Sequence, residues 1–280
     1  MKSLTEPLLE LKSYQTLLQQ IKENHTPVFA TGVIDVQKNH LLYGLQCHTK
    51  RPLLLLTHSE IRAKEIWEDM RFFIKDCMYY PAKDILFYSA DVHSMEMNRQ
   101  RFLVLEKLLA GECSCIVASM EALLDRYPKK EVFSSFLLHL QTAQTYDLKT
   151  LVEQLVYMGY ERAELAESHG QFALRGGILD IYPLTADDAV RIEFWDDEID
   201  SIRSMDAQSQ RSVDKLQQVT VFPMRELVYD KDCALQAAEC IRKDYEKAMQ
   251  QMMQSDIENG VERLKEHIGE NIERLQTEYT

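Results

Sequence analysis

The hydrophobic pattern changes type partway along the chain, and this change constrains the fold more than any other feature. Before residue 127, short continuous apolar runs alternate with segments of helical spacing, whereas after it apolar and polar residues alternate. Continuous apolar runs between helices are typical of parallel strands buried on both faces, and alternation is typical of antiparallel strands with one polar face. The sequence therefore predicts an α/β part followed by an antiparallel part.

In the first part we expect a parallel sheet covered by helices on both faces. Ser59 precedes one helical segment and is expected to cap it. The predicted strands cover residues 27–31, 52–57, 77–80 and 114–118, and the predicted helices cover 8–21, 38–45, 61–73 and 95–109. In the second part, the predicted elements are a helix over 148–158, antiparallel strands around 172–174, 178–180, 192–194 and 199–202, a strand over 219–223, and helix from 230 onward.

Composition excludes several classes of protein. The net charge of −13 argues against a surface that follows phosphates along its whole length. The six cysteines form no C-x-x-C pair and have no histidines at zinc spacing, so we expect reduced thiols and no metal site. No apolar run is long enough to span a bilayer. We therefore expect a cytoplasmic protein with no membrane partner.

A loop after the first predicted strand has some of the residues of a phosphate-binding P-loop. Such a loop has the pattern G-x-x-x-x-G-K-[ST]. Gly32 and Lys38 are in place, but Gln37 replaces the second glycine, Asn39 replaces the hydroxyl residue, and Asp35 adds a negative charge. We expect this degenerate loop to bind no nucleotide.

Glycine is scarce, with nine in 280 residues, but four of the nine lie between residues 159 and 177. Paired glycines inside a strand usually mark a β-bulge, so Gly176 and Gly177 are expected to form one and to redirect Arg175. Arg162 on the preceding strand is expected to share a face with Arg175 and Phe172 across a hairpin. The sequence leaves two interpretations equal: a partner-binding hot spot, or pairing of the arginines with glutamates of the same chain.

The same stretch carries a family resemblance. Residues 170–183, 190–203 and 209–212 resemble the amino-terminal module of the bacterial transcription-repair coupling factors, which is similar to the excision-repair helicase UvrB. The resemblance is strongest from residue 158 to 223. It implies an incomplete RecA-like, P-loop-type domain, residues 1–126 with 213–280, interrupted by an antiparallel α+β domain, residues 127–212, that binds UvrA.

The resemblance also implies functional residues. Arg162 matches the arginine of a Tyr-x-Arg motif and Arg175 matches that of an Arg-Gly motif, and both are implied to contact UvrA. Phe172, Gly176 and Gly177 complete the expected partner site. Ala173 replaces an arginine of UvrB. The resemblance thus favours the hot-spot interpretation.

Together these points predict a non-catalytic module that recruits UvrA in transcription-coupled repair and needs no cofactor. The alternative is a UvrB-like DNA-dependent ATPase or helicase. In the parent family, ATP is expected only in motor domains beyond residue 280, and RNA polymerase and double-stranded DNA are bound by other domains. An intramolecular contact with the missing carboxy-terminal part is expected to mask the UvrA surface.

Overall fold

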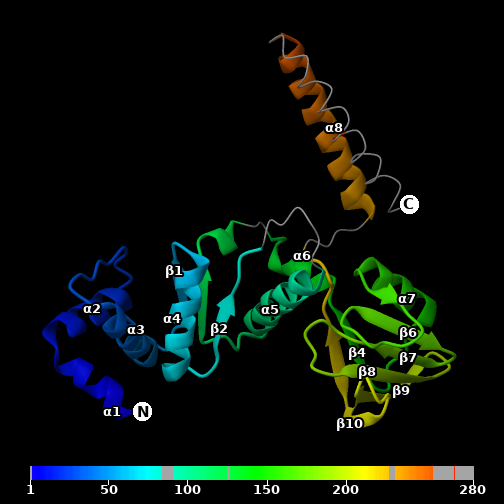
Figure 1. Cartoon of the computed structure of the whole chain (residues 1–280), viewed down its shortest axis with the longest axis horizontal. Coiled ribbons are helices and arrows are strands. Elements are labelled where there is room, and N and C mark those ends of the chain that lie inside the picture. The colour runs from blue at the N-terminus through cyan, green and yellow to red at the C-terminus, as the bar shows by residue number, and fades with distance from the viewer. Residues whose placement is uncertain (1, 84–90, 125–126, 227–230, 255–267, 269–280) are drawn as a thin grey trace. The chain divides into compact units, whose positions relative to one another are not determined.

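A computed structural model describes residues 2–83, 91–124, 127–226, 231–254 and 268 (Figure 1). By its internal contacts the chain divides into two units, Met1–Glu226 and Leu227–Thr280. The domain boundaries expected at residues 126 and 212 remain predictions.

The first part of unit Met1–Glu226 is an α/β fold with a parallel sheet, as predicted. The three strands lie in the order β1-β3-β2, and β3 pairs in parallel with both neighbours. The elements are α1 Lys2–Thr5, the 3-10 helix η1 Glu6–Glu10, α2 Lys12–Lys22, α3 Asp35–Thr49, β1 Leu53–Thr57, α4 Glu60–Phe73, β2 Cys77–Tyr80, α5 Asp91–Ala110, β3 Cys115–Ser119 and the 3-10 helix η2 Glu121–Leu123. Ser59 caps α4 by accepting a hydrogen bond from the Arg62 backbone, as expected.

Among the described residues, helices cover both faces of the sheet at β3 and β2 but only one face at β1. On one face, Met70 of α4 packs with Val117 of β3, and on the other, Val104 of α5 packs with Ile116. The edge strand β1 departs from the prediction, because its Leu54 and Leu56 are 55% and 45% exposed. The expectation of a sheet covered throughout is therefore wrong at β1.

The predicted strand over residues 27–31 is not formed. These residues are irregular, and Phe29 is 86% exposed. With α2 and α3 they line an open cavity of about 610 Å³. An apolar run becomes a strand only where another strand can pair with it, and this segment has no such neighbour among the described residues.

The second part of the unit is built on antiparallel strands, as predicted (Figure 1). Six strands lie in the order β10-β9-β8-β7-β6-β5, and β11 pairs separately with β4. The elements are α6 Lys130–Ser135, β4 Leu138–Gln141, α7 Leu148–Tyr157, β5 Glu161–Arg162, β6 Gln171–Arg175, β7 Ile178–Ile181, β8 Ala189–Trp195, β9 Glu198–Met205, β10 Ser212–Leu216 and β11 Gln218–Val221. One pairing differs from expectation, because β5 runs parallel to β6.

The six-stranded sheet has two faces of different chemistry, because successive side chains of a strand point to opposite sides. The core face packs on α7, and its buried side chains include Phe172, Leu179, Val190, Ile192 and Ile202. The other face carries register partners from β6 to β9, namely Ala173, Asp180, Arg191 and Arg203. We call this second side the arginine face.

The two parts of unit Met1–Glu226 are joined by a buried apolar cluster and a buried ion pair. Phe102 of α5 packs with Phe133, Leu184 and Phe222. The fully buried Arg101 beside it pairs with Glu226. Both kinds of contact tie α5 to the segment that follows β11.

Unit Leu227–Thr280 contains helix α8, Lys231–Gln254. Its presence confirms the prediction of helix after residue 230 as far as residue 254. The remainder of that predicted helix lies outside the described residues, apart from position 268. In the described part of the chain, the helices are too short or too polar to traverse a lipid bilayer.

Candidate partner-binding site

A buried aspartate on the arginine face holds two arginines. Asp180 has no exposed surface. Arg191 binds it with two hydrogen bonds, Nε to Oδ1 at 2.7 Å and Nη2 to Oδ2 at 2.8 Å. Arg175 donates from Nη2 to Oδ2 at 2.5 Å. One carboxylate facing two guanidinium groups leaves this cluster with a net positive charge.

The side chains of Arg191 and Arg175 differ in how much of their surface is exposed to solvent. The Arg191 side chain is 18% exposed, and the hydrogen bond to Asp180 raises its pKa. The Arg175 side chain is 46% exposed, and of its five N–H donors one is bound by Asp180. Fixing a long side chain beforehand lowers the entropy lost on binding. Arg175 is therefore a pre-positioned cation, and its partner is Asp180 rather than the glutamates considered from sequence.

Gly176 and Gly177 form a turn and not the expected bulge. Arg175 pairs with Ile178 across the two glycines, which makes them the two-residue loop of the β6–β7 hairpin. Gly176 has φ +61°, a conformation that favours glycine. A Cβ on Gly177 would lie 3.0 Å from the Phe194 carbonyl oxygen, so a side chain there would crowd β8.

The expectation that Arg162, Phe172 and Arg175 share one face is wrong. Phe172 is fully buried on the core face, three positions along β6 from Arg175, so the two point to opposite sides. Arg162 is in register with Phe172 through a parallel pairing, on the edge strand β5, and is exposed. Phe172 thus supports β6 from within, while Arg162 and Arg175 are presented at different places on the surface.

Sequence reasoning missed Asp180, Arg191 and the neighbouring Trp195. A single aspartate between Leu179 and Ile181 in a strand was a signal that a charged group faces away from the core. Its two arginine partners lie on other strands, and their identity depends on the register. Trp195, at the end of β8, is 81% exposed.

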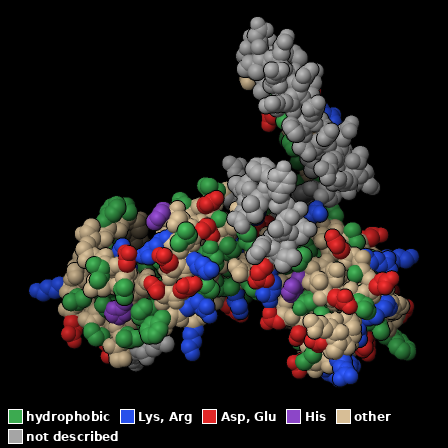
Figure 2. Space-filling model, in the orientation of Figure 1, with side chains coloured by type: hydrophobic (Ala, Val, Ile, Leu, Met, Phe, Trp, Pro, Cys, Tyr) green, Lys and Arg blue, Asp and Glu red, His purple; other side chains and the backbone are tan. Residues whose placement is uncertain are grey.

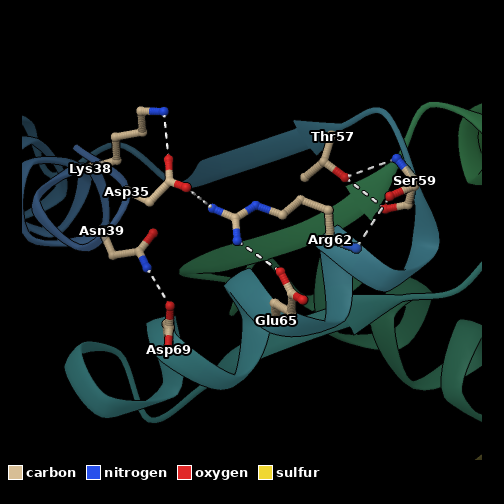
Figure 3. A network of polar contacts seen from close by, with 8 residues as sticks. All are labelled: Asp35, Lys38, Asn39, Thr57, Ser59, Arg62, Glu65 and Asp69. Atoms are coloured by element: carbon tan, nitrogen blue, oxygen red, sulfur yellow. Dashed lines mark hydrogen bonds and ion pairs between the residues drawn. The ribbon is translucent and has the colours of Figure 1, made fainter. Parts of the chain in front are cut away.

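The degenerate loop forms a second cluster of polar contacts (Figure 3). Gly32 has φ +77°, and α3 starts at Asp35, three residues earlier than predicted. The Asp35 carboxylate accepts from Lys38 Nζ at 2.8 Å and pairs with Arg62 at 3.1 Å. The hydrogen bond from Lys38, with the charges of Lys38 and Arg62, lowers the pKa of Asp35. The carboxylate thus engages the cation that would otherwise be offered to a phosphate.

The other two predicted positions of the loop differ in their surroundings. Asn39 is buried and donates to the Asp69 carboxylate on α4 at 3.0 Å. Gln37 lies on the wall of the cavity beside residues 27–31. The hydrogen bond of Asn39 and the ion pair of Asp35 with Arg62 connect α3 to α4, which is a structural role.

Comparison with known proteins extends these observations. Residues 138–227, from β4 through β11, match the family described as the UvrB interaction domain. A transcription-repair-coupling factor of Bacillus subtilis is 31% identical over 221 residues, which cover 78% of this chain and 19% of that protein. The chain is related to the transcription-repair-coupling factors.

Other relatives agree with this assignment. Transcription-repair-coupling factors of two Staphylococcus aureus strains, RF122/ET3-1 and Mu50, are each 28% identical over 245 residues, covering 87% of this chain and 21% of theirs. The chain therefore spans about a fifth of the length of these relatives. The resemblance seen in the sequence is confirmed, and the arginine face lies inside the matched UvrB interaction domain.

Proposed function

We propose that this chain is a non-catalytic module that recruits UvrA for transcription-coupled repair through its UvrB interaction domain. The observation that carries the proposal is the presence of two exposed arginines, Arg162 and Arg175, in the matched segment. A hydrogen bond to the buried Asp180 fixes the side chain of Arg175 before binding. Arginine is enriched among the residues that dominate binding energy at protein interfaces. A partner surface with carboxylates at matching positions would complete the contact.

In this proposal, Arg162 and Arg175 contact UvrA from two separate positions on the sheet. Arg162 lies on the edge strand β5 and has no ion pair among the described residues. Arg175 lies beside the β6–β7 turn, three positions along β6 from the residue in register with Arg162. At about 3.3 Å per residue this separates them by roughly 10 Å along the strand. The partner therefore has to contact the edge of the sheet as well as its arginine face.

Binding of purified UvrA tests the proposal. We expect Arg162→Glu to weaken binding about 30-fold or more, because a hot-spot arginine contributes about 2 kcal/mol. Arg175→Ala is the second variant, since a glutamate at 175 would face the Asp180 carboxylate and disturb the fold as well. The measurement is the Kd from titration calorimetry, with the melting temperature of each variant as a check on folding.

Lys64→Glu is the matched control, because Lys64 is exposed on α4, outside the UvrB interaction domain, and the change in charge is the same. Equal affinities of wild type and both arginine variants would contradict the site. Failure of the wild-type chain to bind UvrA would contradict the proposed function itself.

The proposal includes the absence of nucleotide binding at the degenerate loop, because Asp35 already pairs with both Lys38 and Arg62. We expect no rise in melting temperature on adding millimolar Mg-ATP, compared with Mg²⁺ alone. A ligand at a hundred times its Kd would stabilise the fold by about 2.7 kcal/mol, which is readily seen. A clear rise would instead favour the UvrB-like ATPase.

The proposal also covers two further partners, RNA polymerase and double-stranded DNA. On the face that Figure 2 shows, acidic and basic side chains are interspersed over the coloured residues, with no continuous basic stripe among them. Such a surface gives little support to DNA binding by this part of the chain. We propose that RNA polymerase and double-stranded DNA are bound by other parts of a longer protein, one of which masks the UvrA surface.

A further inference from the structure

A large aromatic side chain lies exposed near the arginine cluster. Trp195 is 81% exposed, whereas the other tryptophan, Trp67, is half-buried and donates from its indole nitrogen to the Cys77 carbonyl at 3.0 Å. Leaving an indole in water forgoes the burial of a large apolar surface. Tryptophan is also the side chain most enriched among interface hot spots, together with tyrosine and arginine.

The strand register places Trp195 beside the glycine turn. Ile178 of β7 pairs with Glu193 of β8, and the Phe194 backbone N–H donates to the Gly177 carbonyl at 2.8 Å. Trp195 is the next residue and the last one of β8. A Cβ built on Gly176 would meet no heavy atom within 4 Å, so the surface beside the turn is open.

Alternation along β8 places Trp195 on the arginine face. Phe194 packs against the core, so Glu193 and Trp195 point to the other side, as Arg191 does. Ile178, which is 36% exposed, is in register with Glu193, and Arg175 is in register with Ile178. An indole, an isoleucine and a half-exposed guanidinium thus occupy neighbouring positions at one end of one face.

The three residues that follow Trp195 along the chain are acidic. Asp196 and Asp197 form the β8–β9 turn and Glu198 follows, and all three are exposed. A partner that accommodates the indole has to bring its own groups close to these three carboxylates. Basic side chains around an apolar socket would satisfy both the ring and the carboxylates.

We infer that Trp195 is the apolar anchor of the UvrA interface and inserts into an apolar socket on UvrA that is rimmed by basic side chains. This inference rests on the proposed function and adds to it a residue and the chemistry of the complementary surface. Arg175 then contacts an acidic group of UvrA beside the socket, while Asp196 and Asp197 contact the rim.

The test is the Kd of the full chain for purified UvrA with four variants. We expect Trp195→Ala to weaken binding about 30-fold or more. Trp195→Phe keeps an aromatic ring and is expected to remain within a few-fold of wild type. Phe72→Ala is the matched control, because Phe72 is 79% exposed on α4, outside the UvrB interaction domain. Asp197→Lys is expected to weaken binding. Tighter binding by that variant would overturn the inference that basic side chains surround the socket on UvrA.

A second measurement reports on the indole directly. In a chain labelled with 5-fluorotryptophan, unlabelled UvrA should shift or broaden the fluorine NMR signal of Trp195 and leave that of Trp67 unchanged. If the wild-type chain binds UvrA while Trp195→Ala binds equally well and the Trp195 signal does not move, the anchor is overturned and the proposed function stands. If the wild-type chain does not bind UvrA, both are overturned.

Discussion

At the scale of single residues, Arg101 shows how this fold accommodates a charge away from water. Its side chain has no exposed surface, yet each part of the guanidinium has a partner. Nε and Nη2 bind the Glu226 carboxylate, Nη1 donates to the Pro81 carbonyl at 2.5 Å, and the guanidinium carbon lies 4.3 Å from the centre of the Tyr80 ring. Removing one member of such a buried pair leaves the other charge uncompensated, which is more harmful than never having buried the pair.

The pH dependence of stability should reveal this ion pair. Burial alone would raise the pKa of Glu226, but the hydrogen bonds from Arg101 and Lys83 outweigh burial, so the pKa in the folded state lies below the ordinary value. The folded state therefore favours the charged form. The resulting stabilisation is complete above the pKa of the unfolded chain, about 4.3, and is lost as the pH falls through the folded-state pKa.

We accordingly expect Glu226→Gln to lower the free energy of unfolding by about 3–5 kcal/mol at pH 7, and this difference from wild type to shrink below about pH 4. Urea denaturation at a series of pH values measures it. Glu153→Gln, on the exposed side of α7, is the control and should change little. A difference that stays constant down to pH 3 would show that the ion pair does not stabilise the fold.

At the scale of elements, the sequence predicted correctly those strands that are determined by the local pattern of apolar residues. It failed for segments whose structure depends on pairing with strands that are distant in the sequence. Strands β1, β2 and β3 were predicted within one residue at each end, because each is an apolar run next to a helical segment. The run at residues 27–31 is also apolar but has no neighbouring strand among the described residues. Likewise, β5 was expected in a hairpin, and nothing in its two residues specifies a parallel partner.

The candidate site shows the same division between local and long-range information. Arg175 and the glycine pair stood out from composition and spacing alone. The role of the glycines was misread, because a bulge and a two-residue turn have the same local sequence and differ in how the flanking strands pair. Asp180, Arg191 and Trp195 become recognisable as a group only when the registers of β6, β7 and β8 are known.

At the scale of the whole molecule, the apolar interior is concentrated in one unit. All five apolar clusters found among the described residues belong to Met1–Glu226. The junction around Phe102 and Arg101 joins the parallel sheet to the antiparallel one within that unit. The arginine face therefore lies on a unit that contains all of the apolar clusters found in the described part of the chain.

This distribution predicts the outcome of a truncation that also tests the domain boundaries expected from sequence. A chain ended after residue 230 keeps all five clusters and the pair between Arg101 and Glu226, so we expect its melting temperature to stay within about 2 °C of the full chain. If residues 213–280 instead complete the α/β domain, the truncation removes part of that domain. The loss of several kcal/mol would then lower the melting temperature by more than about 5 °C, since 1 kcal/mol corresponds to about 2–4 °C at this size. Differential scanning calorimetry distinguishes these two outcomes for the melting temperature. Unchanged UvrA binding by the truncated chain would show that the proposed UvrA-binding surface does not depend on α8.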